Sequence, residues 1–127
     1  YAGRLEPYKG VADLIEALSI VDDPKICLKI AGDGSLNQAL HTQTTNLGLD
    51  DRVTFLGGIR KQEMPETYGS ADALCLPSIV EGMSNVVLEA MASGLPVVAS
   101  NVGSITEVVR EDTGYVIDPD DADWTEA

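Results

Sequence analysis

Short apolar runs rich in β-branched residues alternate with segments of helical spacing along the chain. The runs predict five strands, at 26–31, 53–56, 73–76, 96–100 and 115–117. The first intervening segment places Val11, Leu14, Ile15 and Leu18 at the i, i+3, i+4, i+7 spacing of a helix with one buried face. Further helices are predicted at 35–47, 64–70, 85–93 and 104–111.

The predicted strands are almost continuously apolar, with Lys29 as an exception, which is typical of strands covered on both faces. A strand and a helix recur every ~20 to 25 residues, so right-handed crossovers and a parallel sheet follow. Tyr1 and Ala2 are interpreted as the end of a first strand, and 118–127 as the start of a last helix. The sequence therefore predicts one α/β domain over residues 1–127, an open parallel sheet of about six strands with helices on both faces.

The charge of the chain limits its partners. It carries 21 acidic and 8 basic side chains, a net charge of −13. From Glu107 onward there are eight acids and one base, which is more than half of the excess. A chain this acidic is a poor binder of nucleic acid or anionic membranes, so neither is expected as the main partner. No apolar run approaches the ~20 residues of a membrane-spanning helix, and no transmembrane segment is expected.

Cysteine and histidine offer little candidate chemistry. Cys27 and Cys75 each lie in an apolar run, where two buried free thiols are expected rather than a disulfide framework. The single histidine, His41, lies on a polar stretch of a predicted helix and is interpreted as a surface residue. Neither residue type has the spacing of a zinc site.

Glycines gather in the loops that follow the predicted strands, where open parallel sheets bind ligands. Gly32-Asp33-Gly34 follows a strand and precedes a helix, as in a dinucleotide-binding fingerprint. The third position of that fingerprint is Asn37, where close helix packing needs glycine or alanine. A dehydrogenase of the classical type is therefore disfavoured.

Two carboxylates and two cations are the strongest candidates for chemistry. Glu81 lies in a loop, and Glu89 lies inside the apolar pattern of the helix that follows. A carboxylate there either caps backbone amides or meets a ligand hydroxyl, because its burial without a donor is costly. Arg4 and Lys9 follow the first strand, where they either clamp a diphosphate or remain solvated surface charges.

In combination these residues resemble the C-terminal half of family 4 retaining glycosyltransferases. The pair Glu81 and Glu89, with seven residues between them, is similar to that family's E-x(7)-E motif. The resemblance covers essentially the whole chain, in five blocks: Gly3-Arg4-Leu5 with Lys9-Gly10, then 30–34, 53–57, Pro77-Ser78 with Glu81-Gly82, and 89–98.

The resemblance implies the GT-B architecture, in which two Rossmann-like domains face each other across a cleft. This chain corresponds to the C-terminal domain, which binds a nucleoside diphosphate sugar, and the N-terminal acceptor domain is expected to be absent from it. By resemblance Arg4 and Lys9 hold the diphosphate in place of a divalent metal, so no metal and no cofactor are expected. Glu81 corresponds to the residue that binds donor-sugar hydroxyls, and Glu89 to the residue that binds the ribose. Further donor-binding positions are implied at Gly3, Gly32, Gly34, Ile59, Met83, Ser84, Asn85 and Val86.

The implied reaction transfers a hexosyl unit to an acceptor hydroxyl with retention at the anomeric carbon. The acceptor, a sugar or a lipid-linked glycan, is expected to bind through the N-terminal domain, so the chain alone is expected to be inactive. Ser84 departs from many relatives, which have glycine there, and its Cβ is expected to narrow the sugar pocket. The resemblance also implies a cytoplasmic enzyme, peripheral at the inner membrane face in its full-length form.

Two alternatives to this interpretation stay open. The chain could be a nucleotide-binding module without catalytic activity, or part of another sugar-nucleotide enzyme of the same architecture, such as an epimerase. A phosphorylase would need a lysine for pyridoxal phosphate, and no lysine here lies in a suggestive context. The sequence leaves the nucleotide base, the sugar and the acceptor undetermined.

Overall fold

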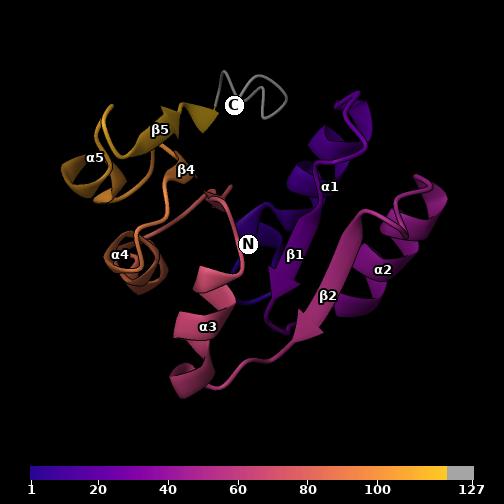
Figure 1. The fold of residues 1–127 in the computed structure, drawn as a ribbon. Coiled ribbons are helices and arrows are strands. Elements are labelled where there is room, and N and C mark those ends of the chain that lie inside the picture. Colours follow the sequence, from indigo (N-terminus) through magenta and orange to yellow (C-terminus); the bar gives the residue numbers. More distant parts are fainter. Residues whose placement is uncertain (120–127) are drawn as a thin grey trace.

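The computed structural model describes residues 1–119, so the expected last helix at 118–127 falls almost wholly outside the described residues. Strands and helices follow the predicted order along the chain (Figure 1). The strands are β1 (Leu28–Ala31), β2 (Val53–Gly57), β3 (Leu74–Leu76), β4 (Val97–Ser100) and β5 (Gly114–Ile117). The helices are α1 (Val11–Ile20), α2 (Asn37–Asn46), α3 (Met64–Gly69), α4 (Asn85–Ala92) and α5 (Ile105–Val108), with 3-10 turns at Pro7–Lys9 and Lys61–Glu63.

All strand pairs are parallel, as the alternation of strands and helices predicts. Hydrogen bonds join β1 to β2, and they join β3, β4 and β5 in that order. The N-terminal residues lie beside β1, where the Tyr1 ammonium donates to the Lys29 carbonyl and Ala2 forms an isolated parallel bridge with Ala31. In Figure 1 the N-terminus accordingly lies between the two groups of strands. The expected six-stranded sheet is thus present as a pair, a triplet and a short N-terminal segment between them.

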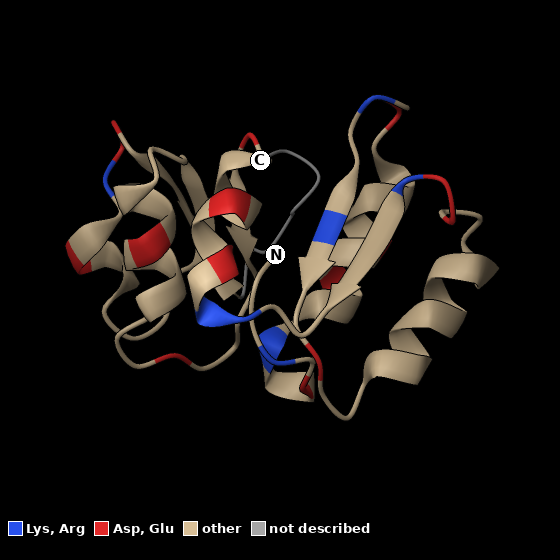
Figure 2. Ribbon diagram, turned by 60° about the horizontal axis from the view of Figure 1, so that its bottom comes forward, with Lys and Arg blue, Asp and Glu red and all other residues tan. Residues whose placement is uncertain are grey.

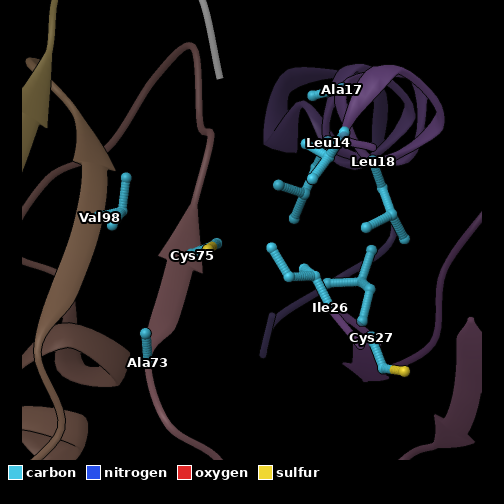
Figure 3. Close-up of a pocket in the computed structure, with 10 residues that line it drawn as sticks. Leu14, Ala17, Leu18, Ile26, Cys27, Ala73, Cys75 and Val98 are labelled. Atoms are coloured by element: carbon cyan, nitrogen blue, oxygen red, sulfur yellow. The ribbon is translucent and has the colours of Figure 1, made fainter. Parts of the chain in front are cut away.

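Helices cover both faces of this arrangement. Leu28 of β1 and Leu14 and Leu18 of α1 line an apolar cavity of about 260 Å³, which extends to Cys75 and Val98 on β3 and β4 (Figure 3). The next side chain of β1 points the other way, as strand alternation requires, and Lys29 Nζ donates to the Ser70 carbonyl at the end of α3. The α/β class with helices on both faces is therefore confirmed.

Loops at the carboxyl ends of the strands are tied to one another by backbone hydrogen bonds. The Ile79 amide, after β3, donates to the Tyr8 carbonyl over 2.8 Å, and the Gly32 amide, after β1, donates to the Gly57 carbonyl over 2.7 Å. The Leu5 amide donates to the Asp33 carbonyl over 3.0 Å. These bonds bring segments that are distant in sequence to one end of the domain.

Three local expectations have definite outcomes. The helix expected at 104–111 ends at Val108, because the backbone of Val109 is extended and its side chain is buried. Cys27 is exposed, so the expectation that it is buried is wrong; it lies just before β1, outside the strand ladder. His41 is exposed, as predicted, and it stacks on the ring of Phe55. Within residues 1–119, no helix is both long and apolar enough to cross a membrane.

Candidate functional site

A pocket of about 290 Å³ opens at the carboxyl ends of the N-terminal segment and β1. Its wall combines the loops after these strands with the loop after β2, with α3 and with the first turn of α4. The pocket brings together half of the predicted functional residues: Gly3, Arg4, Gly32, Ile59, Val86 and Glu89. This position, outside the strand ends, is where an open parallel sheet binds its ligand.

Glu89 occupies the interior side of this pocket. It projects from the second turn of α4, and its Oε2 accepts a hydrogen bond of 3.0 Å from the Tyr68 hydroxyl. The sequence leaves two roles open for Glu89: capping backbone amides or meeting a ligand hydroxyl. No backbone amide of the described residues donates to Glu89, so it does not act as a cap. Glu89 therefore presents a carboxylate to the pocket.

A second cluster centres on Glu81, in the loop between β3 and α4. Lys9 Nζ lies 2.6 Å from Glu81 Oε1, and the Ser78 hydroxyl donates to the same oxygen over 2.7 Å. The side chains of Lys9 and Glu81 are only 16% and 10% exposed. Removal of one partner of such a sheltered ion pair costs far more than removal of one partner of an exposed pair, because it leaves a charge that is both shielded from water and unpaired. Lys9 and Glu81, which are 72 positions apart in the sequence, are thereby brought into contact.

Arg4 is the accessible cation of the site. Its side chain is 74% exposed, and its guanidinium lies 3.5 Å from Glu6 Oε1. Glu6 also accepts hydrogen bonds from the hydroxyl and the amide of Ser35. These bonds from Ser35, with a smaller contribution from Arg4, hold the pKa of Glu6 below its usual value. Arg4 thus lines the pocket, and its contact with Glu6 leaves most of its side chain exposed to solvent.

The N-terminus of α4 follows directly from the Glu81 loop. Ser84 is the N-cap, and its Oγ accepts the Val87 amide over 3.4 Å. Its hydroxyl is therefore used to begin the helix. Met83 is exposed, and the amides of Asn85 and Val86 belong to the first turn, where amides have no partner within the helix. These amides are oriented to meet an anion at the helix end.

Two predicted glycines have evident packing roles. A Cβ on Gly32 would overlap the carbonyl oxygen of Gly3, so the two loops can approach this closely because Gly32 lacks a side chain. Gly34 lies against Leu5, whose backbone pairs with Asp33 and Leu36 on either side of it. Gly32 also lines the pocket, whereas Gly34 is not among its described lining residues.

Two residues that contact the carboxylates carry no motif that marks them in the sequence. Tyr68 and Ser78 are both buried, and each donates its hydroxyl to one of the two glutamates. A signal for Tyr68 exists in the sequence, because a buried tyrosine hydroxyl needs a polar partner. Ser78 belongs to the Pro77-Ser78 block of the resemblance, but its spacing to Glu81 alone does not predict a hydrogen bond.

The resulting site offers carboxylates, cations and free amides within one end of the domain. Carboxylates accept hydrogen bonds from hydroxyl groups, whereas cations and helix-start amides bind phosphate. Among the described residues there is no cluster of three or more His, Cys, Asp or Glu placed to hold a metal ion. Figure 2 shows some of the Lys and Arg positions in the loops beyond the arrowheads of the strands, the end that carries the pocket, and others at the opposite end.

Comparison with known proteins places the whole chain in one family. Residues 1–127 match the family described as Glycosyl transferases group 1. The chain is 36% identical to the uncharacterized glycosyltransferase MJ1607 of Methanocaldococcus jannaschii, over 98% of this chain and 33% of the relative. It is 36% identical to the GDP-mannose-dependent alpha-(1-6)-phosphatidylinositol monomannoside mannosyltransferase of Mycobacterium tuberculosis, over 91% of this chain and 32% of the relative. The chain thus spans about a third of the length of these curated relatives.

A solved structure agrees with the fold. The structure of Anabaena Alr3699/HepE in complex with UDP-glucose superposes with a TM-score of 0.86, at 32% identity. The match covers 96% of this chain and 35% of that protein. The fold described above therefore has a counterpart in a protein crystallised with UDP-glucose.

Proposed function

Because this chain belongs to the group 1 glycosyl transferases, we propose that it is the C-terminal, donor-binding domain of a retaining GT-B enzyme. The domain binds a nucleoside diphosphate sugar, and the full-length enzyme transfers the hexosyl unit to an acceptor hydroxyl. The observation that carries this proposal is the convergence of Arg4, Glu89 and the first turn of α4 on one pocket, with the Lys9–Glu81 pair on the adjoining loops.

Each part of the donor meets a group of matching chemistry. Glu89 accepts hydrogen bonds from the ribose hydroxyls, while Gly58 and Ile59 form the wall that packs on the base. The amides of Asn85 and Val86 and the guanidinium of Arg4 bind the diphosphate. Glu81 binds hydroxyls of the transferred sugar, because it lies in the loop just before the helix start that holds the phosphates.

Lys9 and Arg4 stabilise the leaving group. Negative charge grows on the diphosphate as the anomeric bond breaks, and fixed cations act on that growing charge. In the ligand-free domain Lys9 is paired with Glu81, so its ammonium is already positioned and partly shielded from water. Donor binding then lets one ammonium bridge the Glu81 carboxylate and the phosphate. No divalent metal is needed for this charge balance, and a chelator is expected to leave the activity unchanged.

The reaction proceeds with retention. The bond from the anomeric carbon to the phosphate oxygen breaks, and the bond to the acceptor oxygen forms on the same face of the sugar. The acceptor proton passes to the departing phosphate oxygen. Glu81 and Glu89 therefore act by binding hydroxyls and do not serve as the acid and nucleophile of a glycoside hydrolase.

The rest of the enzyme supplies the acceptor site. The curated relatives are about three times as long as this chain, which supports a second domain in the full-length protein. We assign to that N-terminal domain the binding of the acceptor, a sugar or a lipid-linked glycan, and the closure of the cleft that excludes water.

The proposal is tested in the full-length enzyme with Lys9→Ala and Glu81→Ala. Each substitution is expected to lower turnover by more than about 100-fold, the usual loss when a group that stabilises transition-state charge is removed. Lys25→Ala is the matched control, because Lys25 is an exposed lysine in the turn before β1. Circular dichroism establishes that each variant is folded. Wild-type turnover in both site variants would refute the assignment.

A further inference from the structure

Tyr68 joins two elements of the donor pocket that are separate in the sequence. It lies on α3, which follows the base wall, and its hydroxyl donates to Glu89 Oε2 on α4 over 3.0 Å. Both residues line the pocket, yet Tyr68 is only 4% exposed. The phenol is therefore anchored in the core with only its edge facing the pocket.

The chemistry of this contact holds the carboxylate in one orientation. Burial, together with the hydrogen bond to Glu89, raises the pKa of the Tyr68 phenol, so the hydroxyl keeps its proton and remains a donor at neutral pH. Glu89 accepts no other hydrogen bond from the described residues. Its Oε2 is thus occupied, and its Oε1 is left for a ligand.

We propose that Tyr68 is a positioning residue for ribose recognition, which acts by fixing the Glu89 carboxylate so that one oxygen faces the ribose hydroxyls. This inference rests on the proposed function, since it presupposes that Glu89 meets the ribose. The inference adds a role for Tyr68 in selectivity. The preference for ribose over a sugar without these hydroxyls depends on Tyr68, although Tyr68 itself does not bind the hydroxyls. Because Tyr68 follows Ile59 and Met64 in the same segment, the hydrogen bond also ties the base wall to the ribose carboxylate.

The test compares two ligands in three proteins. UDP, GDP and ADP are first titrated calorimetrically into the full-length protein, and the tightest is taken forward with its 2′,3′-dideoxy analogue. Tyr68→Phe removes only the hydroxyl and is expected to weaken binding of the ribonucleotide about three- to tenfold, the range for one lost hydrogen bond. Binding of the dideoxy analogue should stay within about twofold. Tyr115→Phe, an exposed tyrosine on β5, is the control and should change neither affinity.

A double-mutant cycle separates positioning from general packing. In a Glu89→Ala background, Tyr68→Phe should have no further effect, because its only target is gone. Equal weakening of both ligands by Tyr68→Phe would overturn the proposal, since it would show that the phenol serves only as part of the wall. Unchanged affinity for both ligands would overturn it as well.

Failure of the proposed function gives a different result. If the parent protein binds the ribonucleotide and the dideoxy analogue equally, Glu89 does not read the ribose and both proposals fall. If Glu89→Ala abolishes the discrimination while Tyr68→Phe preserves it, only the role of Tyr68 is lost. As a measurement that keeps the Tyr68 hydroxyl, the protein is labelled with 3-fluorotyrosine, and the Tyr68 fluorine signal should shift with the ribonucleotide much more than with its analogue.

Discussion

Glu81 is held through a single oxygen. Lys9 Nζ and the Ser78 hydroxyl both bind Oε1, at 2.6 and 2.7 Å, and Ser78 is completely buried. The other oxygen of Glu81 makes no hydrogen bond with the described residues. Glu81 and Glu89 are therefore held in the same way: the protein binds one carboxylate oxygen of each, and the other oxygen is open to a ligand.

Ser78→Ala is expected to lower the turnover of the full-length enzyme about three- to tenfold, since Glu81 loses one of the two donors that orient it. The Lys9 ion pair remains, so the loss should be much smaller than that of Lys9→Ala. Steady-state kinetics with varied donor measures the effect. Ser19→Ala is the control, because the exposed Ser19 hydroxyl bonds only to a carbonyl within α1. An unchanged rate would show that Ser78 does not orient Glu81.

The two cysteines are expected to differ in reactivity. Burial raises the pKa of the Cys75 thiol, which lowers its thiolate fraction at neutral pH, whereas Cys27 is exposed. Iodoacetamide followed by mass spectrometry should therefore label Cys27 much faster than Cys75, and urea should make the two rates similar. Cys27→Ser verifies the assignment. Rapid labelling of Cys75 in the folded protein would contradict its burial on β3.

Some residues of the site could be predicted from the sequence and others could not. The motif spacing predicts Glu81 and Glu89 as a pair, and the strand-end rule predicts that Arg4 and Lys9 lie near them. Tyr68 is not predicted as a hydroxyl donor, because its contact with Glu89 joins two helices over 21 residues. Ser78 lies in the same loop as Glu81, three residues before it, but this spacing alone does not predict the hydrogen bond. Cys27 was predicted incorrectly, since the apolar run that contains it begins before its strand does.

At the scale of elements, the turn between β4 and α5 supports the loop that carries Glu81. Gly103 in this turn has a φ of +56°, and a Cβ there would overlap the Glu81 carbonyl oxygen. The Ser104 amide also approaches the Gly82 carbonyl, at 3.5 Å. The position of the Glu81 loop is therefore set by an element that contributes no side chain to the pocket. The sequence pattern places the turn but gives no indication of this contact.

Gly103→Ala is expected to destabilise the fold by about 2 kcal/mol, because it combines a strained backbone with a backbone clash. It should also lower turnover, since relief of the clash displaces Glu81. Gly69→Ala is the matched control: Gly69 ends α3, and a Cβ there meets nothing within 4 Å, so a gain of about 0.4–1 kcal/mol is expected. Urea denaturation measures both variants. A neutral effect of Gly103→Ala would contradict the close approach of the two loops.

At the scale of the whole molecule, the net charge of −13 does not oppose a phosphate ligand at this site. More than half of the excess follows Glu107, whereas Arg4 and Lys9 lie in the loop after the N-terminal segment. Electrostatic interactions between exposed charges fall off within about 10 Å in ordinary salt, so the nearby cations and amides dominate at the pocket. The composition disfavours nucleic acid as a partner, but it gives no indication of the cations and amides that the loops bring to the pocket.

The fold was largely predictable because periodicity and strand order are local properties of the sequence. The division of the strands into β1–β2 and β3–β4–β5 was not, since it depends on residues 1–3, which bond to β1 and, among the described residues, to no strand of the other group. The pocket lies at this junction, where Ala2 and Gly3 meet Ala31 and Gly32. The pocket therefore depends on the packing of the N-terminal segment against β1.

The 127-residue chain by itself is expected to bind nucleoside diphosphate weakly and to transfer no sugar. The pocket supplies contacts to the donor, but in the proposed enzyme the acceptor and the closed, water-free cleft depend on the second domain. Calorimetry should show at least about tenfold weaker binding than in the full-length enzyme, because a closed cleft buries more of the ligand. A radiolabelled donor assay, with the full-length enzyme as the positive control, measures transfer. Steady product formation by the chain alone would mean that the catalytic machinery is complete within this domain.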